Sequence, residues 1–155
     1  MSQLDVYKKE APYFTEVSVL VKRAIYAPAK TITELDEQAL RIVCEYLEIS
    51  TTIKTFSKMG LDVKTPTAPD EWALNICLAM GATDEYWNPP GGKSFFTPKK
   101  YSENKIKLAF MSSELCVYPR GRYPFEPGLS IIDVLMFNNK KRVNEMLDSY
   151  ELEYA

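Results

Sequence analysis

The sequence predicts an α/β fold in which a helical pair is followed by a small, mainly parallel three-stranded sheet flanked by helices. Apolar residues recur at helical spacing within residues 11–27 and 31–49. Short strand-like stretches then alternate with helical ones between residues 50 and 111, an order typical of parallel strands joined by crossover helices. A length of 155 residues with 46% hydrophobic and 26% charged content, without repeats or linkers, predicts one domain over residues 1–155.

The helical pair is predicted from two apolar stripes. Pro12 suits the first turn of the first helix, and its apolar face is formed at spacings of three and four by Phe14, Val17, Val21, Ala24 and Ile25. Thr33 and Asp36 give a T-x-x-D capping pattern for the second helix, whose stripe is formed by Leu35, Ala39, Ile42, Val43 and Tyr46. Because the connection is short, the two helices are expected to pack antiparallel.

The sheet is predicted from strands at residues 50–55, 84–88 and 105–111. A helix from Thr67 to Gly81 separates the first two, and its inward-facing residues are predicted to be Trp72, Ile76, Ala79 and Met80. A short helix within residues 95–104 separates the last two. A loop rich in Pro, Arg and Gly, a buried helix within residues 126–139 and a charged helix over residues 140–154 complete the chain.

The charge balance argues against nucleic-acid binding. Nineteen basic and 21 acidic residues give a formal net charge of −2, and no long run of one sign occurs. Cys44, Cys77 and Cys116 lie far apart among apolar neighbours, as expected for reduced thiols of a cytosolic protein. No apolar run approaches the ~20 residues that cross a bilayer, and residues 1–14 lack the features of a signal peptide. The sequence therefore predicts a cytoplasmic protein without a membrane span.

The chain contains no histidine. This excludes Ser-His-Asp triads, Cys–His dyads and His-ligated metals. Acid–base chemistry would then have to use Asp, Glu, Lys, Tyr or Cys. No metal and no cofactor are expected.

A glycine-rich turn follows the second predicted strand, with the sequence Gly91-Gly92-Lys93-Ser94. Glycines allow a backbone to approach an anion, and a lysine with a hydroxyl can complete a phosphate cradle. The spacing is not that of a G-x-x-x-x-G-K-[ST] loop. It favours a plain Pro-Pro-Gly-Gly turn with a solvated lysine over a cradle.

The loop before the last apolar stretch carries Arg120 and Arg122 around a glycine. Two guanidinium groups can clamp a phosphate or carboxylate, but such a loop can equally serve solubility and turn formation. Tyr118 and Tyr123 can form a wall for a sugar or base, although such residues more often anchor a loop to the core.

The stretch 126–139 contains Ser130 and Asp133, spaced as a capping box. Capping is therefore favoured over catalysis for Asp133. Cys116 is interpreted as a small buried side chain rather than a nucleophile, because nucleophilic reactivity needs a neighbouring base or cation.

Several stretches occur in a recognisable order: residues 7–17 (YKKEAPYFTEV), 50–61, 81–87 (GATDEYW) and 124–138 (PFEPGLSIIDVLMFN). Together they resemble the WbqC-like protein family, and the LSIID segment is the most specific. Family members carry an additional N-terminal segment that should contribute strands and much of the presumed active site. The chain is therefore expected to be a shortened member or one half of a split system. A histidine that often precedes the VYP motif in the family is Leu115 here.

The resemblance implies a role in bacterial surface-polysaccharide or O-antigen synthesis, with N-acylation of a nucleotide-linked amino sugar as the suggested reaction. Under this hypothesis Asp133, Glu126 or Ser113 lies near the reacting amine or acyl group. Phosphates or a carboxylate would be held by residues of the two loops: Gly91, Gly92, Lys93, Ser94, Arg120 and Arg122, with Tyr118 and Tyr123 beside them.

The expected partners are a nucleotide sugar, a second copy of the chain, or a complementary N-terminal chain. The alternative hypothesis is a non-catalytic interaction or regulatory subunit that keeps the fold and needs a partner chain.

Overall fold

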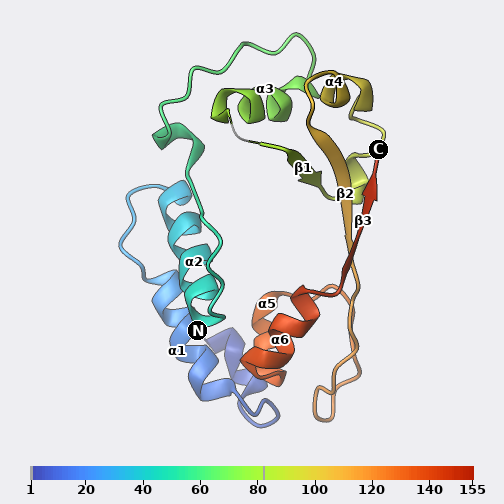
Figure 1. Cartoon of the computed structure of the whole chain (residues 1–155). Helices are drawn as coiled ribbons and strands as arrows, with labels where there is room; N and C mark the ends of the chain where they lie inside the picture. The colour runs from blue at the N-terminus through green and yellow to red at the C-terminus, as the bar shows by residue number, and fades with distance from the viewer. Residues whose placement is uncertain (1, 82) are drawn as a thin grey trace. The chain divides into compact units, whose positions relative to one another are not determined.

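The computed structural model describes residues 2–81 and 83–155 (Figure 1). Contacts divide the chain into two compact units. The helical unit comprises Met1–Ile53 and Leu115–Ser149, and the sheet unit comprises Lys54–Glu114 and Tyr150–Ala155. Each unit has its own hydrophobic core.

The helical unit contains a 3-10 helix η1 (Ser2–Tyr7) and helices α1 (Phe14–Ile25), α2 (Ile32–Tyr46), α5 (Ile131–Phe137) and α6 (Lys140–Leu147). The predicted helical pair is confirmed, because α1 and α2 pack against each other. The cap of α2 was misplaced by two residues. Thr31, not Thr33, accepts the hydrogen bond from the Glu34 amide at 3.2 Å, so the capping pattern is T-x-x-E.

The core of the helical unit lies where α1 meets α5 and α6. Its least exposed side chains are Val17, Leu135, Met136 and Val143. Burial of each such side chain contributes about 1.5–3 kcal/mol. The predicted stripe of α2 is half-buried throughout, and its residues Ile42, Val43 and Tyr46 pack on the edge of this core.

The sheet unit contains helices α3 (Glu71–Met80) and α4 (Pro98–Glu103), short 3-10 turns η2 (Phe56–Lys58) and η3 (Pro90–Gly92), and strands β1 (Glu85–Asn88), β2 (Lys107–Ser113) and β3 (Tyr150–Tyr154). The strand order is β1-β2-β3, with β1 parallel and β3 antiparallel to β2. The α/β class is confirmed. The sheet is mixed rather than mainly parallel, because its third strand comes from the C-terminal segment.

Two predicted elements were wrong. No strand of the described chain includes residues 50–55. They form neither a strand nor a helix, and Arg41 donates a hydrogen bond to the carbonyl oxygen of Ile53. The predicted C-terminal helix ends at Leu147, and Tyr150–Tyr154 forms β3. The sequence YELEY alternates with the period of a strand, and backbone pairing with β2 selects that conformation.

Helices α3 and α4 cover one face of the sheet (Figure 1). Their core residues, Leu74 and Tyr101, pack against Leu108 and Phe110 of β2. The predicted inward face of α3 was wrong in part. Trp72 is 52% exposed and Met80 is 46% exposed, whereas the buried residues are Leu74, Asn75 and Cys77.

Candidate functional site

A buried carboxylate, that of Asp133, lies at the centre of a hydrogen-bonded cluster in the helical unit. Asp133 is on the first turn of α5, and only 1% of its surface is exposed. A carboxylate removed from water in this way is stable only when donors satisfy its oxygens. The cluster supplies those donors from two separate parts of the chain, the N-terminal segment and the loop before α5.

The four acceptor positions of the Asp133 carboxylate are all occupied. Oδ1 accepts from the Tyr118 hydroxyl at 2.7 Å and from Arg120 Nε at 3.0 Å. Oδ2 accepts from Arg120 Nη2 at 2.7 Å and from the Tyr7 hydroxyl at 2.9 Å. The Arg120–Asp133 pair is therefore bidentate, the strongest geometry for a guanidinium and a carboxylate.

Burial and the contacts with Asp133 raise the pKa values of the three donors. Burial is the main cause of the raised pKa of the Tyr118 hydroxyl, and its hydrogen bond to Asp133 adds to it. Burial and the same carboxylate also raise the pKa of Tyr7. The hydrogen bond to Asp133 raises the pKa of Arg120. Both tyrosines therefore remain protonated donors at neutral pH.

Arg120 also fixes the loop in which it lies. Its Nη1 donates to the carbonyl oxygen of Pro124 at 2.9 Å, and its guanidinium carbon lies 5.8 Å from the centroid of the Phe137 ring. Tyr118 packs edge-on against Phe125 at 5.3 Å between ring centroids. The loop of residues 118–126 is thus attached to α5 by the Arg120–Asp133 ion pair, the Tyr118–Asp133 hydrogen bond and the Arg120–Phe137 contact. The Tyr118–Phe125 contact lies within the loop.

The predicted capping box is only partly confirmed. The Ser130 hydroxyl caps α5 by accepting from the Ile132 amide at 3.3 Å. The Asp133 side chain does not cap the helix, since its oxygens bind Tyr7, Tyr118 and Arg120 instead. The ion pair with Arg120, 13 positions away in the sequence, thus determines where the Asp133 side chain lies, and the S-x-x-D capping pattern does not.

Arg122 lies on the exposed side of the same loop. Its side chain is 67% exposed, with Nε 3.3 Å from Glu10 Oε1 and its guanidinium 5.3 Å from the centroid of the Tyr123 ring. Gly121 has a φ of +59°, and a Cβ there would come within 2.6 Å of Glu10 Oε2. The positive φ therefore favours a glycine between the two arginines. Glu126 is exposed, and no hydrogen bond or ion pair to it occurs within residues 2–81 and 83–155.

The other predicted site residues lie in the sheet unit. Ser113 is the last residue of β2, and its side chain is exposed. The glycine-rich turn folds as η3, in which the amides of Gly92 and Lys93 donate to the carbonyl oxygens of Pro89 and Pro90. Lys93 forms an ion pair with Glu153 of β3. Ser94 is exposed beside it.

A second charged cluster, in the sheet unit, was not predicted. Lys100 on α4 lies 2.8 Å from Asp70 Oδ1 and 2.9 Å from Glu71 Oε1 at the start of α3. Asp70 is buried and also accepts from the Thr97 amide at 3.2 Å. Thr67 donates to Glu71 through both its amide and its hydroxyl. This cluster joins α3 to α4, and sequence spacing gives no signal for it.

The sheet unit is expected to lose stability in acid because of this cluster. The hydrogen bond from Lys100 lowers the pKa of Asp70, and with Thr67 it lowers the pKa of Glu71 to about 2. A carboxyl whose pKa is lower in the folded state stabilises the fold above its unfolded pKa, so this stabilisation is lost as the pH falls from about 4 towards 2. Both tryptophans, Trp72 and Trp87, lie in the sheet unit. Tryptophan fluorescence during thermal unfolding across this range therefore measures the effect.

The matched variants for this prediction are Lys100→Met and Lys99→Met. Lys100→Met is expected to remove most of the acid dependence between about pH 4 and 2 while lowering stability at neutral pH. Lys99 is a neighbouring lysine with an 82% exposed side chain. Lys99→Met should therefore leave the acid dependence and the stability at neutral pH unchanged. Equal acid dependence in the two variants would contradict the assignment.

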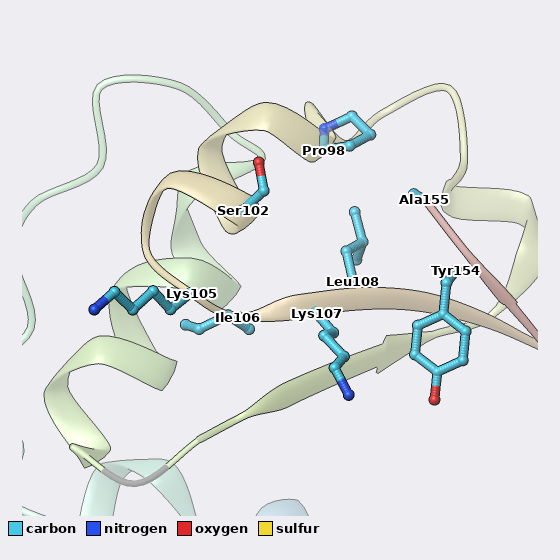
Figure 2. A pocket seen from close by; sticks show the side chains of 8 residues that line it. All are labelled: Pro98, Ser102, Lys105, Ile106, Lys107, Leu108, Tyr154 and Ala155. Atoms are coloured by element: carbon cyan, nitrogen blue, oxygen red, sulfur yellow. The ribbon is translucent and has the colours of Figure 1, made fainter.

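A hollow of about 400 Å³ lies between α4 and the adjacent ends of β2 and β3 (Figure 2). Pro98, Ser102, Lys107, Leu108 and Tyr154 are among the residues that line it. In Figure 2 the side chains of Lys107 and Tyr154 extend to the opposite side of β2 from that of Leu108. Both of those side chains interact with Glu85. None of the predicted site residues lines this hollow.

The structure thus brings Tyr118, Arg120 and Asp133 together, with Arg122 and Tyr123 on the same loop. Sequence reasoning missed Tyr7 and Glu10, which bind this loop and α5 from the N-terminal segment. Tyr7 opens the YKKEAPYF stretch, so the motif itself was the available signal. Two motifs far apart in sequence meet at one carboxylate.

No helix of the described residues is long and apolar enough to cross a membrane. Comparison with curated proteins and with solved structures gives no match. The model of the WbqC-like protein family matches residues 1–145, which include every residue of the Asp133 cluster and exclude β3. The chain belongs to the WbqC-like protein family.

Proposed function

We propose that this protein acts on a nucleotide-linked amino sugar during bacterial surface-polysaccharide (O-antigen) synthesis, as an N-acyl or aminoacyl transferase. The observation that supports this most is family membership over residues 1–145, together with the motif residues that converge on Asp133. In the proposed reaction the sugar amine attacks the carbonyl carbon of an activated acyl donor. The C–N bond forms, the leaving group departs with its electron pair, and a carboxylate takes the amine proton.

The 118–126 loop supplies residues suited to this chemistry. The exposed Arg122 guanidinium can bind a phosphate group, and the Tyr123 ring beside it can pack against a sugar or base. The exposed Glu126 carboxylate is proposed as the base. Asp133 is proposed to position the loop rather than to react, because its oxygens already accept four hydrogen bonds.

Residues of the sheet unit retain a proposed role in anion binding. Lys93 and Ser94 present a cation and a hydroxyl on the turn that contains Gly91 and Gly92. An anion at Lys93 must displace Glu153, which now pairs with it. Ser113 remains a candidate for contact with the acyl group.

A second candidate function is a non-catalytic interaction or regulatory subunit that requires a partner chain. The hydrogen bonds of Asp133 favour the regulatory-subunit function. This buried carboxylate of the LSIID segment already accepts hydrogen bonds at both oxygens, and these bonds hold the loop in place. In that case the loop would present Arg122 and Glu126 to another protein.

A thermal-shift experiment with UDP- and dTDP-linked amino sugars distinguishes the two candidates. A ligand that binds the native state raises the unfolding temperature by mass action. We expect a shift with at least one sugar nucleotide, and its loss in Arg122→Ala. The control is Arg142→Ala, which removes another half-exposed arginine of the helical unit. No shift with any ligand, or equal loss in both variants, would contradict the nucleotide-sugar proposal.

A further inference from the structure

The connection between α1 and α2 carries an exposed apolar surface. Ile25 is 53% exposed, Tyr26 72% and Ile32 70%. Ile25 is the last residue of α1, Tyr26 follows it, and Ile32 is the first residue of α2. The three residues therefore flank the loop between α1 and α2, which is drawn in light blue (Figure 1). We call residues 22–33 the hairpin tip. Single exposed apolar side chains are normal on a protein surface, whereas a group of large ones is typical of an interaction surface.

The backbone of the hairpin tip is held in place by α2. Gln38 Nε2 donates to the Pro28 carbonyl oxygen at 2.6 Å, and the Lys30 amide donates to Glu34 Oε2 at 2.8 Å. Thr31 caps α2. The apolar side chains are therefore displayed on a fixed turn rather than on a loop that can fold back over them.

The hairpin tip is basic within an acidic protein. Lys22, Arg23 and Lys30 lie within it, and no Asp or Glu occurs between residues 22 and 33, although the whole chain has a net charge of −2. The acidic group beside it is Glu34, whose carboxylate accepts from the Lys30 amide. Arg23 pairs with Glu45 on the surface. The ammonium groups of Lys22 and Lys30 have no ion-pair partner within residues 2–81 and 83–155 and are exposed.

A hollow of about 320 Å³ lies between the two helix ends. Ile25, Ile32 and Leu35 supply apolar walls, and Lys30 lines it too. This arrangement offers an apolar recess next to a cation, the combination that suits part of an acyl chain beneath an anionic headgroup.

We infer that the hairpin tip docks on the surface of an anionic lipid bilayer. Ile25, Tyr26 and Ile32 would enter the boundary between headgroups and acyl chains, and the lysines would contact anionic headgroups. A second copy of the tip is disfavoured, because it would set the unpaired Lys22 and Lys30 of one copy against those of the other. A protrusion of three apolar side chains is also small for a stable protein interface, which buries about 800 Å² on each partner.

Flotation with lipid vesicles tests this inference on the full chain. Vesicles of phosphatidylcholine with phosphatidylglycerol are compared with vesicles of phosphatidylcholine alone. We expect the protein to float with the anionic vesicles and to be partly released by high salt. Tyr26→Ser with Ile32→Ser should lower the vesicle partition coefficient by roughly tenfold or more. Lys22→Glu and Lys30→Glu should each lower it by roughly fivefold or more.

Leu147→Ser is the matched control, because Leu147 is 47% exposed on α6 of the same unit. It should leave flotation unchanged, and circular dichroism confirms that all variants are folded. Absence of flotation with anionic vesicles, or equal flotation by the tip variants, would overturn the inference. Loss of a wild-type dimer in Tyr26→Ser/Ile32→Ser, without any vesicle binding, would assign the tip to self-association instead.

Discussion

Replacing Asp133 by asparagine is expected to destabilise the helical unit by roughly 3–5 kcal/mol. The change preserves the size of the side chain but removes the charge that pairs with Arg120 at 2.7 Å. It leaves a guanidinium with a 13% exposed side chain without its counter-ion. It also places an amide NH₂ group against donors from Tyr7, Tyr118 and Arg120. Hydrogen exchange of the α5 amides measures the loss of stability in this unit.

Asp36→Asn is the control for this prediction. Asp36 is an exposed aspartate on α2 of the same unit, so its replacement should change stability by no more than about 0.5 kcal/mol. If Asp133→Asn were as stable as Asp36→Asn, the Asp133 cluster would not be the main polar anchor of the unit.

Replacing Tyr101 by alanine is expected to destabilise the sheet unit by roughly 3–5 kcal/mol. Tyr101 has no exposed surface, and its ring stacks on Tyr86 at 5.8 Å and meets the edge of Phe96 at 5.9 Å. Removal of the ring leaves a cavity among α3, α4 and β2 that the surrounding side chains fill only in part. Tryptophan fluorescence during denaturant unfolding measures the effect, because both tryptophans belong to this unit.

Tyr101→Phe separates the ring from the hydroxyl. The hydroxyl donates a long hydrogen bond, 3.5 Å to the Asp70 carbonyl oxygen, and it also interacts with the backbone of Leu74. Its loss should therefore cost only about 0.5–1.5 kcal/mol. A cost for Tyr101→Phe equal to that for Tyr101→Ala would place the stabilisation in the hydroxyl and contradict the packing argument.

The parts of the fold that depend on local periodicity could be predicted from the sequence. The 3.6-residue periods of α1 and α2 lie in the sequence itself, and so does the cap that Ser130 provides for α5. Strand pairing depends on distant residues. The C-terminal YELEY stretch becomes a strand because β2 offers an unpaired edge, whereas the β-branched stretch at residues 50–55 finds no such partner in the described chain.

In the candidate site, too, local features could be predicted from the sequence, whereas contacts between distant residues could not. Tyr118, Arg120 and Asp133 were each identified from residue type and loop composition, but their mutual contacts were not. The Tyr118–Asp133 bond spans 15 positions, and the Tyr7–Asp133 bond spans 126. Local spacing instead favoured a helix cap for Asp133. A local sequence pattern shows that Ser130 is close to Asp133, but it does not show that the fold also brings the Arg120 guanidinium next to Asp133.

A double-mutant cycle between Arg120 and Asp133 tests the central claim, that the LSIID carboxylate anchors the arginine-bearing loop. The cycle compares Arg120→Met, Asp133→Asn and the double variant by hydrogen exchange of the α5 amides. We predict a coupling free energy towards the upper end of the roughly 0.5–3 kcal/mol range found for contacting residues. The double variant should then be much more stable than the sum of the single losses implies. Losses that add to within about 0.5 kcal/mol would show that the two residues act independently and would contradict the claim.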